Sequence, residues 1–441
     1  MIGHDDTLPA DLLLRAGILV PQDGERRVID DAGLAVKGSA IAAVGPWNEL
    51  AATPAREFLD CSGDVVLPGL VNAHTHAAMT VFRGLGDDLP LMEWLSGRIW
   101  PAEARLSAEI VEIGTTLACA EMLAGGTTTF NDQYIFARDV ARAVHAAGMR
   151  CVLGEGVFDT PNASYATMDQ AFERVAALED SCRDKPLLTT CLVAHSVYAT
   201  GHETLKRLAA MRRASGGILT LHAAENAQET ALCLERFGKR PLAVLDGLGL
   251  LEPGLLLAHC VQVEAAEALL LAERGVAVAH CPRSNMKLAS GMAPVTAMRR
   301  AGVRMGLGTD GAASNNALNM FSEMGAAALL AKVCEGDPTA LPARDVLDMA
   351  TREGAAALGL DNVGALAPGM QADLIALRRD HPALQPGFDP VSDLVYAAHA
   401  APVRLTMAAG RVLYKDGRHL TIDRRELDLA LEGVRQWARG G

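Results

Sequence analysis

The chain has 441 residues, half of them apolar, and its 53 acidic and 40 basic side chains give a formal net charge of −13. This length suits a barrel with an accessory unit, and the apolar fraction is sufficient for a large core. Because an acidic surface repels polyanions and no Lys- or Arg-rich run offsets it, we exclude nucleic acid as a partner.

The cysteines and the apolar runs indicate where the protein works. Nine scattered cysteines without a C-x-x-C pair make a poor disulfide framework and fit a reducing compartment. Residues 1–20 carry Asp5 and Asp6 and lack the basic region of a secretory signal. No apolar run reaches the roughly 18 residues of a membrane span. We therefore expect a cytoplasmic protein without a membrane partner.

The predicted elements fall into three stretches of the chain. Residues 12–20, 33–36 and 41–44 are typical of short strands with turns between them. The middle of the chain then repeats a β-like run followed by a helical stretch, with runs at 65–76, 127–132, 150–158, 187–195, 217–222, 255–259, 276–281 and 303–310. Short strands return at 373–377, 405–409 and 411–414, followed by a Lys-Asp-Gly turn at 415–417.

This alternation predicts the fold class. Strands that alternate with helices indicate a parallel sheet, and eight such units indicate a closed barrel. We therefore predict an α/β protein, a (β/α)8 TIM-type barrel with a small β-sandwich built from both chain ends. Residues 1–66 would form the N-terminal part of the sandwich, 67–364 the barrel, and 365–441 the rest of the sandwich and a terminal helix.

Four of the predicted strands end in side chains that can bind a metal. Active sites of such barrels lie at the C-terminal ends of the strands. The first run closes with His74 and His76, which point to the same face because they are two residues apart. The fifth, sixth and eighth runs end at His222, His259 and Asp310. Core histidines or an Asp-Gly turn would explain any one of these, but the whole set is hard to obtain by chance.

His74, His76, His222 and Asp310 make a coherent ligand set for one divalent metal ion. Three imidazoles and a carboxylate suit zinc, with iron(II) or manganese(II) as alternatives. Such a set leaves a position for water, whose pKa a catalytic metal lowers from about 15.7 to roughly 7. Glu225 would project toward this site if a helical turn begins at His222, and would then act as a proton donor and acceptor. A solvated Glu at a helix start is the alternative.

Several strings resemble the amidohydrolase superfamily. They are LPGLVNAHTH at 67–76, HAAE at 222–225, HCP at 280–282 and GTDG at 308–311. Within it the chain is most similar to the 5′-methylthioadenosine/S-adenosylhomocysteine deaminase group, in MT at 79–80, RG at 83–84, DDLPLMEWL at 87–95 and IWPAE at 99–103. The resemblance covers nearly the whole chain. It implies hydrolytic deamination of 5′-methylthioadenosine, S-adenosylhomocysteine, 5′-deoxyadenosine or adenosine to the inosine analogue and ammonia.

A deaminase of this kind must also move protons at the reacting ring. Asp310, as a ligand, is placed to accept the proton of the attacking water. Glu225 is the candidate for protonating a ring nitrogen and for carrying protons to the leaving group. The resemblance implies that His259 steadies or polarises the attacking oxygen.

The resemblance also implies contacts with the nucleoside. Glu103 would accept hydrogen bonds from the ribose hydroxyls, and His195 and Ser314 would contact the nucleoside. Trp94 would line the pocket. Two of these residues have structural alternatives, because Trp94 can be a packing residue of an amphipathic helix and Ser314 a helix N-cap.

The chain departs from the superfamily pattern at two places. Members with two metals usually bridge them with a modified Lys at the end of the fourth strand, where this chain reads LVAHS at 192–196, so we predict a single metal. Close members of the group have an Arg after the third strand, near the place of Glu155. A carboxylate cannot hold the amino-acid carboxylate of S-adenosylhomocysteine as a guanidinium would, whereas substrates with uncharged 5′ groups are not affected.

Two other functions stay open from the sequence. The first is an amidohydrolase acting on guanine, oxidised guanine, a pterin or an s-triazine, and Glu103 would distinguish it because a free base has no ribose. The second is a metal-binding assembly subunit without turnover, against which the intact ligand set and Glu225 argue. We also expect a homo-oligomer, a dimer or tetramer, with a small purine nucleoside as substrate.

Overall fold

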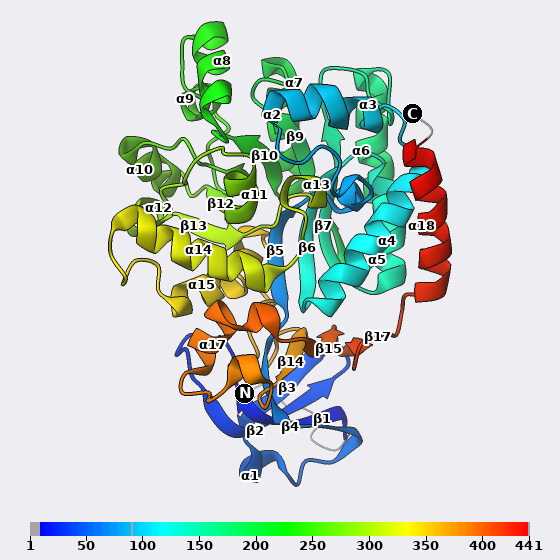
Figure 1. Ribbon diagram of the computed structural model, residues 1–441, viewed down its shortest axis with the longest axis vertical. Coiled ribbons are helices and arrows are strands. Elements are labelled where there is room, and N and C mark those ends of the chain that lie inside the picture. Colours follow the sequence, from blue (N-terminus) through cyan, green and yellow to red (C-terminus); the bar gives the residue numbers. More distant parts are fainter. Residues whose placement is uncertain (1–8, 90, 440–441) are drawn as a thin grey trace.

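The computed structural model describes residues 9–89 and 91–439 and places a barrel above a second sheet along the long axis of the molecule (Figure 1). Among the helices of these residues, none combines the length and the apolar character needed to cross a bilayer. The nine cysteines are free thiols, and all but Cys334 are buried.

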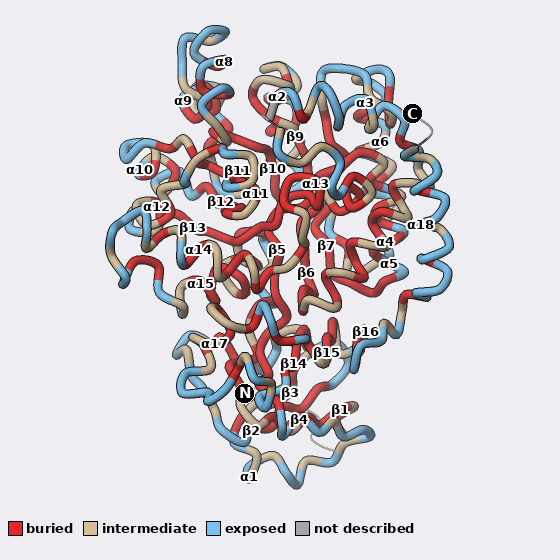
Figure 2. Tube along the Cα trace, viewed as in Figure 1, coloured by how far each residue is buried: buried red, intermediate tan, exposed pale blue. Residues whose placement is uncertain are grey.

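The barrel has the predicted parallel strands, paired in chain order and nearly closed. They are β5 (Leu70–Thr75), β6 (Thr127–Tyr134), β7 (Arg150–Val157), β9 (Leu192–Ser196), β10 (Leu219–Ala223), β11 (Leu255–His259), β12 (Ala277–His280) and β13 (Arg304–Leu307), with the short β8 (Leu188–Thr190) beside β7. Their residues are almost all buried because side chains fill the inside and helices cover the outside (Figure 2). The prediction of an eight-stranded α/β barrel is confirmed.

Helices cover the barrel and fill the loops at its upper end. The loop after β5 holds η1 (Ala77–Phe82), α2 (Leu91–Trp94), the π-helical η2 (Leu95–Ile99) and α3 (Trp100–Glu103). The other helices are α4 (Ala108–Ala124), α5 (Ala137–Ala147), α6 (Met168–Cys182), α7 (His202–Ser215), α8 (Ala227–Phe237), α9 (Pro241–Gly247), α10 (Ala265–Glu273), α11 (Pro282–Lys287), α12 (Val295–Ala301), α13 (Ala312–Asn315), α14 (Met320–Glu335), α15 (Ala343–Met349) and α16 (Arg352–Ala357).

Side chains join the first and last barrel strands. The carboxamide of Asn72 on β5 donates to Thr309 Oγ1 at 2.7 Å and accepts the Thr309 N–H at 2.9 Å. The N–H of Asp310 donates to the carbonyl of His74 at 3.0 Å. The two strands that carry predicted metal ligands are therefore tied together where those ligands lie.

The second sheet unites the two chain ends, as predicted. Its strand order is β17 (Arg418–His419), β16 (Arg411–Lys415), β15 (Val403–Ala408), β14 (Leu374–Arg378), β4 (Ala55–Pro68), β1 (Ala10–Leu19), β2 (Ile29–Lys37) and β3 (Ala40–Pro46). The flanking helices are α1 (Trp47–Leu50), η3 (Pro382–Leu384), α17 (Pro390–Tyr396), η4 (Ala398–Ala400) and α18 (Arg424–Arg439). In Figure 1, α18 runs back along the barrel beside α4.

Gly69 marks the passage from this sheet into the barrel. The run predicted at 65–76 is divided here, because β4 ends at Pro68 and β5 begins at Leu70. A Cβ at Gly69 would lie 2.1 Å from Thr128 Oγ1, so only glycine fits the close approach of the two strands. The strand bearing His74 and His76 is thus a direct continuation of the second sheet.

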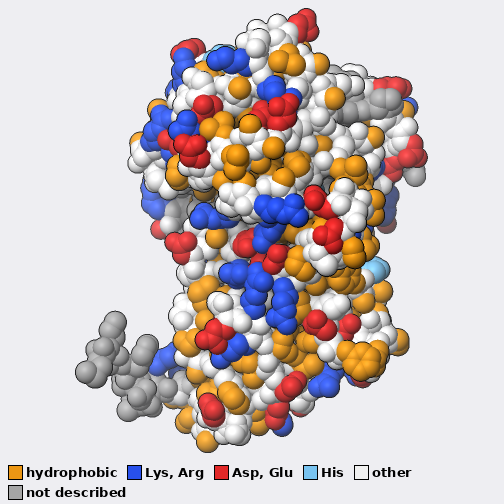
Figure 3. All heavy atoms as spheres, turned by 90° about the vertical axis from the view of Figure 1, so that its left-hand side faces the viewer, with side chains coloured by type: hydrophobic (Ala, Val, Ile, Leu, Met, Phe, Trp, Pro, Cys, Tyr) orange, Lys and Arg blue, Asp and Glu red, His pale blue; other side chains and the backbone are white. Residues whose placement is uncertain are grey.

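Charged groups contribute to the junction of the two units. On the face shown in Figure 3, Lys and Arg side chains gather at mid-height of the molecule. Arg150 at the start of β7 pairs with Asp373 just before β14, at 3.0 Å and with both side chains buried. Arg26 pairs with Asp345 of α15 at 3.0 Å. These pairs join the barrel to the second sheet on the side away from the C-terminal ends of the barrel strands.

Candidate metal centre and active site

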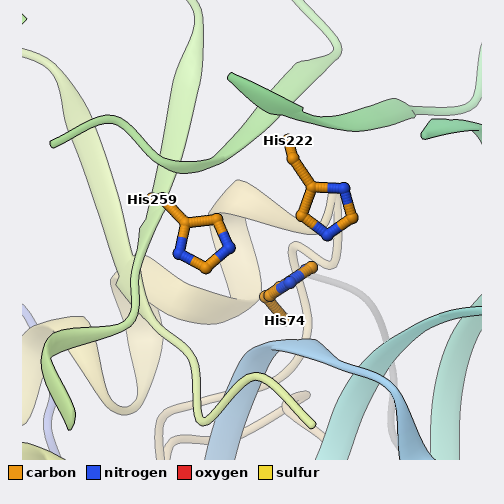
Figure 4. Close-up of side chains that lie close together, drawn as sticks. All are labelled: His74, His222 and His259. Atoms are coloured by element: carbon orange, nitrogen blue, oxygen red, sulfur yellow. The ribbon is translucent and has the colours of Figure 1, made fainter. Parts of the chain in front are cut away.

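Side chains from three strand ends converge inside the upper end of the barrel. The Nε2 atoms of His76 and His222 lie 3.2 Å apart. Asp310 Oδ1 lies 3.2 Å from His76 Nε2 and 3.4 Å from His74 Nε2. In Figure 4 the rings of His74 and His222 approach each other nearly at right angles, with centroids 5.0 Å apart. The structure thus brings the four predicted ligands together.

The hydrogen bonds of the imidazoles fix which nitrogens face the centre. His76 Nδ1 donates to the carbonyl of Gln133 at 2.6 Å, and His222 Nδ1 donates to the carbonyl of His195 at 2.7 Å. Both Nε2 lone pairs therefore point inward, as in a metal site whose ligands are held by backbone carbonyls. At this separation the two nitrogens are joined either by a proton, as a hydrogen bond, or by a metal ion.

His74 is the imidazole whose surroundings point most directly to a bound ion. It is completely buried, and neither ring nitrogen has a hydrogen-bond partner within the described part of the chain. Buried polar groups are almost always satisfied, so a ligand for His74 Nε2 is required. Burial lowers the pKa of His74 to about 4, which keeps the ring neutral. Burial is the largest single influence on His76 and lowers its pKa, but the hydrogen bond and charge of Asp310, the Gln133 carbonyl and the charge of Asp132 together raise that pKa to about 9.

This donor set fits one divalent metal ion. Two groups of ligand atoms in the described residues lie within 4.8 Å of one another, and they share His74. One is His74, His76 and Asp310, and the other is His74, His222 and His259. His74 is common to both groups, and the end of β9 at 192–196 has no Lys. A single metal ion therefore stays the prediction.

Asp310 is held so that only one of its oxygens faces the imidazoles. Its backbone is in the left-handed region, at φ 60°. Oδ2 accepts hydrogen bonds from Ser284 Oγ at 2.6 Å and Ser314 Oγ at 2.5 Å. Oδ1 stays free to bind a metal. Ser284 was not anticipated, because it lies on α11 and no local pattern links it to Asp310.

Ser314 and His259 have defined places beside this centre. Ser314 lies within α13, which is preceded by Gly311, so the N-cap alternative is wrong. The Ser314 hydroxyl donates a hydrogen bond to Asp310, and its contact with a nucleoside stays a prediction. His259 ends β11 at φ 73°, and its Nδ1 bonds Asn285 Oδ1 at 2.9 Å. Asn285 therefore sets the orientation of the His259 ring, whose edge faces His74 in Figure 4.

The turn that carries Glu225 differs from the predicted helical turn. Ala224 lies at φ 52°, and α8 begins only at Ala227. The N–H of Glu225 donates to Glu229 Oε2 at 2.7 Å, which holds the backbone in this bend. Burial raises the pKa of Glu225, and the nearby Asp310 carboxylate raises it further. Glu225 therefore lies near the centre as a carboxyl that keeps its proton more readily than a solvated Glu.

Glu103 reaches the same region from the loop after β5. Its Oε1 accepts a hydrogen bond from Tyr134 Oη at 2.7 Å, and burial raises its pKa. The Tyr134 ring lies 6.1 Å from the ring of His76, so the pair borders the ligand set. Tyr134 was missed because the second run was predicted to end at Asp132, although Tyr134 lies two residues further along the same face of β6.

His195 forms an aromatic wall on the other side. Its ring centroid lies 4.9 Å from His222, 4.8 Å from Phe158 and 5.9 Å from Tyr198. Burial lowers the pKa of His195 to about 4, so it is a neutral donor and acceptor. Trp94 is buried, and its Nε1–H donates to the carbonyl of Leu85 at 3.2 Å. This contact gives it a packing role, and its place in the substrate pocket stays a prediction.

Glu155 is committed to the protein scaffold. Its buried carboxylate accepts hydrogen bonds from Ser164 Oγ at 2.6 Å and from the N–H groups of Ala137 at 2.7 Å and Phe136 at 3.2 Å. These bonds fasten the start of α5. The carboxylate is therefore a capping group for that helix.

Known proteins resemble this chain over nearly its whole length. The sequence pattern of the Amidohydrolase family matches residues 65–413. A 5-methylthioadenosine/S-adenosylhomocysteine deaminase of Nitratidesulfovibrio vulgaris (strain Hildenborough) is 49% identical over 432 residues, which are 98% of each chain. The structure of an adenosine deaminase from Xanthomonas campestris with bound zinc has a TM-score of 0.95 and 40% identity, covering 98% of this chain and 99% of that one.

A more distant structure shares the fold. An atrazine chlorohydrolase from Arthrobacter aurescens complexed with zinc has a TM-score of 0.88 and 23% identity, covering 96% of this chain and 99% of that one. At this identity the likeness extends to the arrangement of barrel and second sheet.

Proposed function

The chain belongs to the amidohydrolase family, and from this premise we propose that it is a metal-dependent deaminase of 5′-modified adenosines. The reaction would convert 5′-methylthioadenosine, S-adenosylhomocysteine, 5′-deoxyadenosine or adenosine to the inosine analogue and ammonia. The observation that carries the proposal is the position of Glu103, which Tyr134 holds beside the ligand His76. A carboxylate there suits ribose hydroxyls and has no evident purpose for a free base.

We propose zinc as the metal, with iron(II) or manganese(II) as alternatives, held by His74, His76, His222 and Asp310. The buried, unpartnered His74 and the inward Nε2 atoms support this ligand set, and the zinc in the Xanthomonas campestris adenosine deaminase supports the ion. When bound, the ion supplies Lewis acidity, which lowers the pKa of water to roughly 7 and provides a nucleophile at neutral pH.

The protein's own residues then manage the protons. Asp310 Oδ1 accepts the proton that the attacking water loses, because Oδ2 is occupied by two serine hydroxyls. Glu225 donates a proton to the ring nitrogen next to the reacting carbon, a task that its raised pKa favours. It then takes a proton from the hydroxyl group that has added to that carbon and passes it to the departing ammonia, and the proton held by Asp310 finally restores the Glu225 carboxyl. His259, oriented by Asn285, polarises the attacking oxygen.

The pocket residues bind the nucleoside through its sugar and ring. Tyr134 occupies one oxygen of Glu103, so the other is available to the ribose. His195 contacts the nucleoside as a neutral imidazole between Phe158 and His222. The carboxylate of Glu155 is engaged at α5, so S-adenosylhomocysteine stays among the proposed substrates. A cytoplasmic location and a dimeric or tetrameric assembly stay predictions.

An activity screen tests this proposal. Metal-assayed protein is offered adenosine, 5′-methylthioadenosine, S-adenosylhomocysteine, 5′-deoxyadenosine, guanine and cytosine, and ammonia release is followed. We expect turnover of adenosines and none of the free bases, and a loss of kcat/KM for nucleosides of about tenfold or more in Glu103→Ala. Glu109→Ala, at an exposed carboxylate of α4, is the control. A preference for guanine, or an unchanged kcat/KM in Glu103→Ala, would contradict the proposal.

A further inference from the structure

A second carboxylate, Glu229, lies behind Glu225. It occupies the first turn of α8, and only 4% of its surface is exposed. Its Oε2 accepts the N–H of Glu225 at 2.7 Å, while its Oε1 has no hydrogen-bond partner among the described residues. Burial of a half-satisfied carboxylate is costly, so this side chain has a function that offsets the cost.

The cap at the start of α8 departs from the usual pattern. In a capping box the third helical residue, a Glu, accepts the N–H of the N-cap residue. Helix α10 follows this rule, since Glu267 accepts the N–H of its N-cap, Glu264, at 2.9 Å. In α8 the N-cap Asn226 accepts the N–H of Glu229 at 2.9 Å, but the Glu229 side chain reaches one residue further back. The hydrogen bond that a capping box makes to the N–H of the N-cap residue is therefore made to the N–H of Glu225.

The bend before Glu225 is held from both of its sides. Ala224 is in the left-handed region, which a residue with a side chain adopts only when its surroundings enforce it. The carbonyl of Ala224 accepts the N–H of Gln262 at 2.8 Å. The next N–H along the chain, that of Glu225, donates to Glu229 Oε2. Without Glu229, one of the two restraints on this bend is gone.

Glu225 and Glu229 face the same surroundings. Burial raises the pKa of Tyr198, and the charges of Glu225 and Glu229 both add to this effect, so the tyrosine lies near both carboxyls. Burial also raises the pKa of Glu229 itself to about 7.

We propose that Glu229 is a positioning residue whose carboxylate fixes the bend at Ala224 and so aims Glu225 at the metal centre. The proposal rests on the proposed function only in taking Glu225 as the group that transfers protons. Among the described residues, the Glu229 side chain hydrogen-bonds the N–H of Glu225 and none of the proposed metal ligands.

The test compares Glu229→Ala with Glu229→Gln, because an amide oxygen can still accept the N–H of Glu225 and a methyl group cannot. For Glu229→Ala we expect kcat on the best nucleoside to fall about 20- to 100-fold, with KM changed less than about threefold and metal content as in the wild type. Glu229→Gln should recover at least about tenfold of this loss. A kcat for Glu229→Ala within about twofold of the wild type would overturn the proposal.

A matched control separates this role from a general effect of helix capping. In α6 the side chain of Gln170 likewise accepts the N–H of the residue before the N-cap, Ala166, at 2.8 Å and on an exposed surface. Gln170→Ala removes this equivalent acceptor, and kcat should stay within about twofold. An equal loss of kcat in both Ala variants would overturn the proposal. If Glu229→Ala does not fold, Glu229→Asp replaces it, since a side chain one methylene shorter cannot reach the N–H; normal kcat in that variant would also overturn it.

Hydrogen–deuterium exchange makes the test independent of catalysis. In peptides spanning residues 221–227, the Glu225 amide should exchange faster in Glu229→Ala and near the wild-type rate in Glu229→Gln. Unchanged exchange in Glu229→Ala would overturn the positioning role. If the wild type deaminates no nucleoside, the proposed function fails, while the exchange data still decide whether Glu229 holds the bend.

Discussion

The two serine hydroxyls on Asp310 allow the metal centre to be weakened without touching a ligand. Ser284→Ala and Ser314→Ala each remove one donor to Oδ2, and the double variant leaves that oxygen without either serine hydroxyl. We expect all three variants to bind zinc more weakly, because a carboxylate free to rotate no longer presents Oδ1 to the imidazoles at its present geometry.

The size of the effect follows from the hydrogen bonds. A hydrogen bond to a charged group contributes about 1.5–3 kcal/mol, and about 1.4 kcal/mol corresponds to a factor of ten in affinity. Either single variant keeps one anchor, so the lower figure applies and zinc affinity should fall about tenfold. The double variant keeps neither, and a loss of about 100-fold or more is expected.

Competition with a chromophoric chelator measures the zinc affinity, and steady-state kinetics measure KM on the same preparations. Ser181→Ala, which removes a half-buried hydroxyl bonded to the Leu178 carbonyl, is the control. Zinc affinity within about twofold of the wild type in the double variant would show that the two serines do not hold Asp310 in its metal-binding position. A raised KM with unchanged zinc affinity in Ser314→Ala would instead support its predicted contact with the nucleoside.

Three further predictions concern carboxyl groups and one of their partners. Glu225→Gln should keep its metal and lose about 10²–10⁴-fold in kcat, measured by ammonia release, because an amide cannot transfer the proton. Tyr134→Phe leaves Glu103 without its donor, and KM for nucleosides should rise about tenfold. Burial raises the pKa of Glu323 to about 8, above the roughly 4.3 of an unfolded chain. The folded state therefore binds the extra proton, and the free energy of unfolding should fall as pH rises from about 4.5 to 8 and then level off. Urea unfolding of Glu323→Gln should show a shallower fall of the free energy over this pH range than the wild type.

Each of these predictions has an outcome that contradicts it. Near-normal turnover of Glu225→Gln would remove that residue from the mechanism. An unchanged KM in Tyr134→Phe would show that Glu103 needs no partner to bind the sugar. If the pH slope of Glu323→Gln is as steep as that of the wild type and of the control Glu335→Gln, at an exposed carboxylate of the same helix, then Glu323 is not its source.

The barrel and the convergence of the ligands could be predicted because both follow from short-range periodicity. His74 and His76 share a face since side chains alternate along a strand, and the ends of parallel strands meet at one edge. His222 and Asp310 then arrive at that edge with their strands. The ligand roles themselves stay predictions, supported by the unpartnered nitrogens of His74.

The surroundings of the ligands depend on contacts that no local pattern encodes. The three-residue spacing of His222 and Glu225 suggested a helical turn, but Gln262 and Glu229 hold Ala224 in the left-handed region instead. Ser284 meets Asp310 only because α11 begins immediately after the neighbouring strand, β12. Short polar side chains carry little sequence signal for such long-range contacts.

The passage of β4 into β5 through Gly69 has a consequence for synthesis on the ribosome. β4 pairs with β1 on one edge and with β14 on the other, and β14 emerges about three hundred residues later. The strand that bears His74 and His76 therefore lacks half of its anchor until nearly the whole chain has been made. Metal capture is then a late event that requires both ends of the polypeptide, and a chain released before β14 would carry its histidines without a firm hold on the ion.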